Sequence, residues 1–119
     1  SWRDGVEQFI RSCCYGERNG IAVLTVEDQQ RIFRRLSKES YCMFREKQAR
    51  LFGSLLECFG VGATRERISL FTNLSLSVMI IRRAIPDTLP LFVPQAADET
   101  VDIQINAIVN WLEGLRETT

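Results

Sequence analysis

Histidine is absent from this sequence of 119 residues. It is the commonest general base and metal ligand in proteins, and the usual side chain that titrates near neutral pH. Net charge is absent too, because 15 Lys and Arg residues balance 15 Asp and Glu residues. Most nucleic-acid-binding domains depend on excess positive charge to attract phosphates. We therefore expect no histidine-based catalysis, no metal site and no direct contact with nucleic acid.

Long apolar runs and catalytic motifs are also missing. The sequence has no run of about 18 or more apolar residues and no signal peptide with a basic start and an apolar middle. It contains neither a glycine-rich phosphate loop nor a Gly-x-Ser-x-Gly motif around a nucleophilic serine. We expect no membrane association, no cofactor and no catalytic residue, so the chain is predicted not to be an enzyme.

The four cysteines are Cys13, Cys14, Cys42 and Cys58, and no Cys-x-x-Cys pair is present to support a zinc site. Cys42 and Cys58 lie in stretches with helical apolar spacing, where a free cysteine behaves as a small hydrophobic residue. We therefore expect buried or partly buried free thiols and a cytoplasmic location, or a nuclear one in a eukaryote. The alternative is a reactive thiol at Cys13, where basic neighbours would favour the thiolate.

What the sequence does contain is the composition of an ordinary globular protein, with 45% hydrophobic and 25% charged residues. The length suits one domain, so residues 1–119 are predicted to form a single helical regulatory or interaction domain. The chain begins at Ser1 and reaches an apolar pattern at once with Trp2. We expect it to be excised from a longer protein.

Apolar spacing predicts an all-α, bundle-like fold of about five helices. The first helix carries an apolar stripe from Trp2 to Cys13 and stops at Tyr15 and Gly16. The run 21–24 is either an extended crossing or a buried helical turn. A long helical pattern opens at Thr25, and the polar patch 37–40 is either a break between two helices or a bend in one.

The second half contains a central apolar helix and a C-terminal amphipathic helix. The least polar stretch, 68–85, favours a buried helix, although 74–78 also alternates like a strand. The three prolines after it are predicted to break regular structure, within an ordered connection over 87–97 that packs Leu89, Leu91, Phe92 and Val93 inward. The last segment, 98–115, sets apolar residues at helical steps, with 101–106 again open to a strand interpretation.

The segment 62–68, leading into 74–87 and followed by the amphipathic segment 101–115, resembles the C-terminal ligand-binding and dimerisation domain of TetR-family transcriptional regulators over about half the chain. The resemblance implies a homodimer formed by the last two helices of each chain. It also implies that helices from the first half enclose a pocket for a small apolar inducer. Ligand binding would then shift the helix packing.

Two sets of residues are the candidate sites. The predicted ligand pocket consists of Phe33, Phe44, Phe52, Phe71 and Met79, which would otherwise be ordinary core. The predicted dimer interface consists of Val78, Ile81, Arg82, Val101, Ile105, Ile108, Trp111, Leu112 and Leu115. The competing hypothesis is a monomeric protein–protein interaction module whose apolar groove binds a partner helix or peptide.

Two basic groups remain to be placed. Arg31, Arg34, Arg35 and Lys38 share one helical side and, with Arg45 and Arg50, could grip an acidic peptide or a phosphate. The alternative is a solvated face that nearby acids neutralise. Arg82 and Arg83 follow the most apolar helix, so at least one of them must reach water, a ligand carboxylate or an acidic partner.

Overall fold

The computed structural model describes residues 1–16, 26–87 and 92–117. Its elements are α1 (Trp2–Cys14), α2 (Val26–Arg35), α3 (Lys38–Cys58), α4 (Arg65–Asp87), a short 3-10 helix η2 (Pro94–Ala96) and α5 (Ala97–Glu117). The all-α prediction is confirmed, because the described residues form five α-helices and no strand. Both stretches with a strand alternative, 74–78 and 101–106, lie inside helices. The expectations for 21–24, Leu89 and Leu91 fall outside the described residues.

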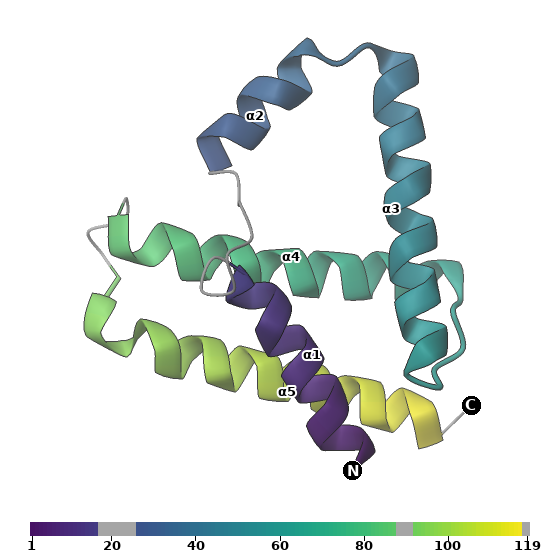
Figure 1. Cartoon of the computed structure of the whole chain (residues 1–119), viewed down its shortest axis with the longest axis vertical. Helices are drawn as coiled ribbons and strands as arrows, with labels where there is room; N and C mark the ends of the chain where they lie inside the picture. Colours follow the sequence, from purple (N-terminus) through teal and green to yellow (C-terminus); the bar gives the residue numbers. More distant parts are fainter. Residues whose placement is uncertain (17–25, 88–91, 118–119) are drawn as a thin grey trace.

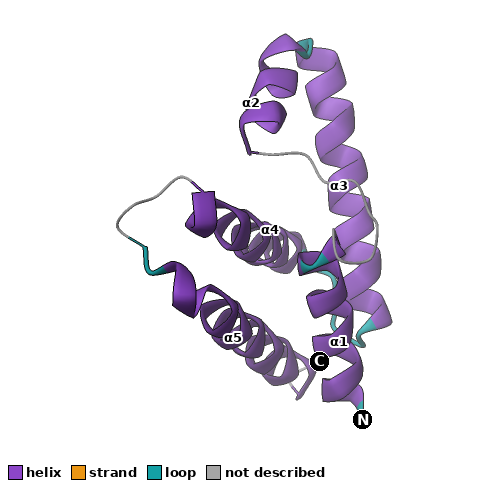
Figure 2. Ribbon diagram, turned by 60° about the vertical axis from the view of Figure 1, so that its left-hand side comes forward, coloured by secondary structure: helices purple, strands orange, loops and turns teal. Residues whose placement is uncertain are grey.

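The body of the molecule is built from α1, α4, α5 and the C-terminal half of α3. Helix α5 returns beside α4, and α1 packs against both of them (Figures 1 and 2). The C-terminal half of α3 lies on α4. The buried apolar residues of these four helices form one core together with Tyr15 and Val61, which lie just after α1 and α3. The helical members are Val6, Ile10, Cys14, Leu56, Phe71, Val78, Val101, Ile105, Ile108, Val109 and Leu112.

Local hydrogen bonds explain where the helices begin. The hydroxyl of Ser1 accepts a hydrogen bond from the backbone N–H of Asp4, and the hydroxyl of Ser37 accepts one from Ser40 at 3.1 Å. Ser37 therefore starts α3 after α2 has ended at Arg35, so the patch 37–40 begins a new helix rather than bending one. Gly60 follows α3 with φ +77°, a conformation that glycine adopts without steric cost.

Two expectations about the prolines are wrong. Helix α4 continues through Pro86 to Asp87, because a proline in the last turn removes only one backbone hydrogen bond before the helix ends. Pro94 does not break structure either, since it opens η2, where a missing N–H costs little. Phe92 and Val93 are exposed rather than packed inward, because they precede η2 and lie outside the helices whose residues form the core.

The arm, which we define as α2 with the N-terminal half of α3 (residues 26–51), extends away from this body (Figure 1). Every residue from 37 to 51 is exposed except the half-buried Gln48. Among the five α-helices described, α2 is the one without extensive helix–helix packing. Helix α4 is also less covered than its composition predicts, because Leu70, Leu74 and Ile80 on it are exposed. The molecule therefore presents apolar side chains on the arm and on the outside of α4.

Candidate functional site

An aromatic cluster stands on the arm. The rings of Phe33 on α2 and Phe44 on α3 meet edge to face with centroids 5.1 Å apart, and Tyr41 contacts Phe33 at 6.3 Å. Such T-shaped pairs are a favourable arrangement of aromatic rings. All three rings belong to exposed residues. The cluster therefore holds α2 against α3 while leaving apolar surface in contact with water.

Two hollows adjoin this cluster. The arm groove, of about 420 Å³, lies between the arm and α4 and is lined by Phe33, Tyr41, Phe44, Arg45, Gln48, Ala49, Ile68, Ser69, Thr72, Asn73 and Leu76. The arm cleft, of about 370 Å³, lies between α2 and α3 and is lined by Gln29, Ile32, Phe33, Leu36, Ser40 and Phe44. Phe33 and Phe44 line both hollows, so the two meet at the aromatic pair. Volumes of this size are typical of small-molecule sites.

The five residues of the predicted ligand pocket do not lie together in the structure. Phe33 and Phe44 line the arm groove, whereas Phe52 and Phe71 form a T-shaped pair at 5.6 Å inside the body. Phe71 is buried, and Met79 packs against the core without lining the groove. The five residues separate because only the C-terminal half of α3 packs on the body, while its N-terminal half belongs to the arm. Phe44, two turns before Phe52, therefore faces the groove while Phe52 packs inside.

Sequence reasoning missed the polar residues of the arm groove. Tyr41, Arg45 and Gln48 follow one another at steps of four and three along α3, a spacing that places them on one face. That signal is readable from the sequence. The facing residues on α4, Ser69 and Asn73, have no such signal, because only the packing of α3 on α4 brings them opposite the arm.

The predicted dimer interface is corrected for five of its residues. Val78, Val101, Ile105, Ile108 and Leu112 are at most 3% exposed within the chain itself. Ile81, Trp111 and Leu115 are half-buried. The apolar face of α5 is wide because two helices of the same chain, α1 and α4, cover it. A wide face therefore indicated two neighbours within the fold, and these five residues form core rather than an accessible surface.

Arg82, also predicted for the interface, packs on the end of α1. Its guanidinium lies 4.0 Å from the centre of the Tyr15 ring and donates a hydrogen bond of 3.2 Å to the carbonyl of Cys14. A cation at this position also complements the negative end of the α1 dipole. The Tyr15 hydroxyl donates to the carboxylate of Asp98 at 3.3 Å. Burial, and then Asp98, raises the pKa of Tyr15.

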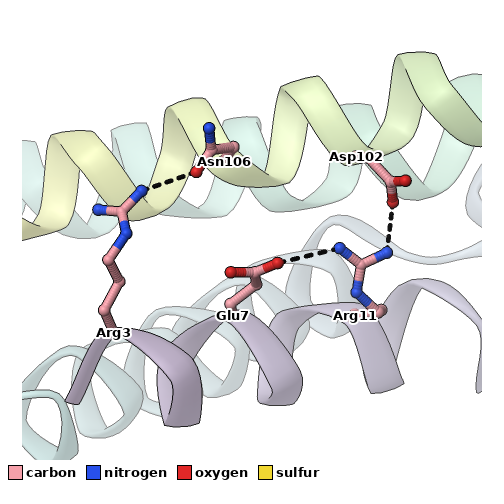
Figure 3. A network of polar contacts seen from close by, with 5 residues as sticks. All are labelled: Arg3, Glu7, Arg11, Asp102 and Asn106. Atoms are coloured by element: carbon pink, nitrogen blue, oxygen red, sulfur yellow. Dashed lines mark hydrogen bonds and ion pairs between the residues drawn. The ribbon is translucent and has the colours of Figure 1, made fainter. Parts of the chain in front are cut away.

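A polar network joins α1 to α5 (Figure 3). Arg3 donates to Asn106 at 2.7 Å, as Figure 3 shows. It also donates to the carboxylate of Glu113 at 2.9 Å. Arg11 bridges Asp102 on α5 and Glu7 on its own helix. The hydrogen bond with Asp102 is the main cause that raises the pKa of Arg11. Arg3 and Arg11 are therefore engaged in contacts within the fold, and a different arginine, Arg45, lines the arm groove.

The cysteines are all free, but only Cys14 is buried. Cys13, Cys42 and Cys58 are exposed, contrary to the expectation, because the sides of α1 and α3 that carry them are not covered by another helix. Desolvation raises the pKa of the Cys13 thiol, which disfavours the thiolate that a reactive cysteine needs.

Over the parts of the chain that the structure describes, no group of three or more Cys, Asp or Glu side chains is placed to hold a metal ion.

None of the described helices is both long enough and apolar enough to cross a membrane. No family model matches the chain, and no curated protein or solved structure matches it. The function is inferred from two features of the structure, the arm groove and the outer side of α4.

Proposed function

We propose that the chain is a non-enzymatic helical regulatory domain that pairs with a second copy through the outer sides of α4 and α5 and admits a small apolar ligand into the arm groove. This is the type of function that the resemblance to TetR-family regulators implies, with an interface that keeps Ile81 and Trp111 and replaces the buried residues by exposed ones. The observation that carries it is an apolar stripe left uncovered on α4.

The α4 stripe consists of Leu70, Leu74 and Ile81, with Ser77 between the last two. Leu70 is 43% and Leu74 39% exposed, and Ile81 is half-buried. Successive steps of four, three and four residues are the spacing by which one helix packs along another. Burying such a stripe against a partner helix removes apolar surface from water and stabilises the pair.

Helix α5 adds a second row of uncovered residues. Ile103 is 71% exposed, Ala107 is exposed one turn further on, and Trp111 is half-buried a turn after that. Because α4 and α5 lie side by side, their outer residues suit an interface in which two helices of one copy pack on the same two helices of another. A twofold axis would make each copy's surface the partner of itself.

The position of α4 supports a link between ligand and pairing. Two residues along an α-helix correspond to a rotation of about 200°. Leu70 and Leu74 therefore lie on the side of α4 opposite to Thr72 and Leu76, which line the arm groove. A ligand that shifts α4 from the groove side would alter the stripe on the other side, and the two binding events would be coupled.

The test is the molar mass in solution, measured by light scattering in reductant over an approximately tenfold range of concentration. The wild type should have about twice the chain mass of 13.7 kDa. The double variant L70E/L74E should be a monomer with an unchanged helical circular dichroism spectrum. The matched control M43E/L51E, which places the same charges on exposed residues of the arm, should remain a dimer.

Charges at Ile105 or Ile108 would be unsuitable, because both residues are buried and the change would unfold the chain. A wild type that is monomeric at every concentration would overturn the proposed pairing. The monomeric interaction module would then be the better hypothesis, with the exposed cluster on the arm as the surface that its partner covers.

A further inference from the structure

We propose that the ligand of the arm groove is an amphipathic carboxylate, a small molecule with one anionic head and an apolar tail. This inference rests on the ligand-binding part of the proposed function and specifies its chemical class. It is carried by an arginine that lines a groove of mixed polar and apolar residues with no acid to pair with, and by the apolar cleft that continues the groove beyond the aromatic pair.

Arg45 supplies the charge. Within the described part of the chain it makes no hydrogen bond or ion pair, in contrast to Arg3, Arg11 and Arg31, which are each paired with a carboxylate. Its own helix cannot neutralise it in the usual way. The positions three and four residues away on α3 are Cys42, Tyr41, Gln48 and Ala49.

The lining of the arm groove also contains no Asp or Glu, so Arg45 is the one charged residue among its lining residues. A planar guanidinium matches a carboxylate in shape as well as in charge. A cationic ligand would be repelled. A neutral apolar ligand would remove water from Arg45 without supplying a partner, which costs free energy.

Two amides complete the polar part of the groove. Gln48 lies one turn beyond Arg45 on α3, and Asn73 lines the same groove from α4. In the described structure neither side-chain amide has a hydrogen-bond partner. The hydroxyls of Ser69 and Thr72 differ, because they already donate to the carbonyls of Arg65 and Ile68 at 3.1 and 2.7 Å. The available donors are therefore one guanidinium and two amides, a set suited to a single carboxylate.

The apolar part provides room for the tail. Phe33 and Phe44 line the groove beside Arg45 and also line the arm cleft, where Ile32 and Leu36 extend the apolar wall. A tail that runs from the groove over the two rings into the cleft would cover Phe33, Phe44 and Ile32, all of which are exposed in the free chain. Removing this surface from water supplies the main part of the binding free energy, and Arg45 supplies the preference for an acid.

The test uses decanoate as the probe and decanol as its neutral counterpart, both below the concentration at which they aggregate, at neutral pH and low salt. Binding is followed by the backbone amide signals in NMR spectra of the whole chain. Decanoate should shift the signals of residues 44–48 and 69–73 and bind about fivefold more tightly than decanol, the ratio expected for one well-placed ion pair near the surface.

Two variants separate the head from the tail. Arg45→Met should reduce the affinity for decanoate to that for decanol and leave decanol binding unchanged. Arg50→Met, which removes a charge from the same helix outside the groove lining, should change neither affinity. Phe44→Ala should weaken both ligands. All three residues are exposed, so the body of the fold should persist in each variant, which circular dichroism can verify. Because Phe44 also holds α2 through its contact with Phe33, the preference for an acid is judged from Arg45→Met and Arg50→Met.

The proposal is overturned if decanoate and decanol bind equally, if Arg45→Met leaves the preference intact, or if the shifted signals lie outside the groove. It is also overturned if an amphipathic helical peptide of leucine and glutamate shifts these signals and decanoate does not. The site would then serve a protein partner. None of these results depends on the oligomeric state, so failure here is distinguishable from failure of the pairing measured by light scattering.

Discussion

The indole N–H of Trp2 donates a hydrogen bond of 2.7 Å to the backbone carbonyl of Phe59, 57 residues later in the chain. Phe59 is the C-cap residue that follows α3, so this bond ties the start of α1 to the end of α3. The guanidinium of Arg116 lies 4.6 Å from the centre of the same indole ring. Trp2 therefore joins the ends of three helices, and its side chain has a structural role.

Trp2→Phe should lower the free energy of unfolding by about 1–2 kcal/mol, because the Phe59 carbonyl loses its donor. Urea denaturation measures the change. Trp111→Phe is the control, since the Trp111 indole has no hydrogen bond in the described structure and should lose less. Equal losses in the two variants would show that ring area, and not the hydrogen bond, is responsible.

Leu56→Ala should destabilise the chain by about 2–5 kcal/mol, because Leu56 is 0% exposed and its removal leaves a cavity between α3 and the core. Leu51→Ala on the same helix should cost less than about 0.5 kcal/mol, because Leu51 is 59% exposed. Thermal unfolding distinguishes them readily. A large effect at Leu51 would mean that the arm is covered in solution.

Gly60→Ala should destabilise the fold by about 1 kcal/mol, because the residue has φ +77° and a Cβ is strained there. Gly5→Ala should instead stabilise the fold. Gly5 lies inside α1, and a Cβ at this position meets nothing within 4 Å. The gain in helix propensity should be about 0.5–1 kcal/mol. Chemical denaturation of both variants checks the pair, and the same sign in both would contradict this account.

Tyr15 should make stability fall at high pH. Burial raises its pKa above the ordinary value of 10.0, so the unfolded chain releases this proton at a lower pH than the folded chain does. The contribution is fully present below about pH 10 and is lost as the pH rises through the folded-state pKa. Urea denaturation between about pH 8 and about pH 11 should show a steeper decline for the wild type than for Tyr15→Phe. Parallel declines would contradict this prediction.

The arm should exchange its backbone amide hydrogens faster than the body, because residues 37–51 are almost all exposed and α2 has little helix–helix packing. Hydrogen exchange followed by mass spectrometry should show weak protection in α2 and the first half of α3, and strong protection in α5. Decanoate should slow exchange in the arm if it binds in the groove. Equal protection of α2 and α5 in the free chain would indicate that another surface covers the arm.

The sequence predicted the helical class and most of the helices, because apolar spacing, caps and glycines act within a few residues. At Ser37 it left a break or a bend open, and the structure shows that the side chain starts α3 through a bond to an amide three residues later. The same local reasoning failed at Pro86, where the helix tolerates the loss of one hydrogen bond near its end. It also left the strand alternatives open over 74–78 and 101–106, which packing within the body decided for helix.

The pairing of surfaces depended on tertiary structure. Ile105 and Ile108 have the spacing of an interface, but apolar spacing states only that a face is covered and not which chain covers it. Arg45 is exposed like its neighbours on α3, and it became a candidate ligand residue only because α3 and α4 form a groove beside it. Composition and periodicity thus determined an all-α chain and its helix faces, since these depend on neighbours along the sequence. The choice between core, groove and exposed stripe depends on contacts between distant residues, and only the arrangement of the helices in space decided it.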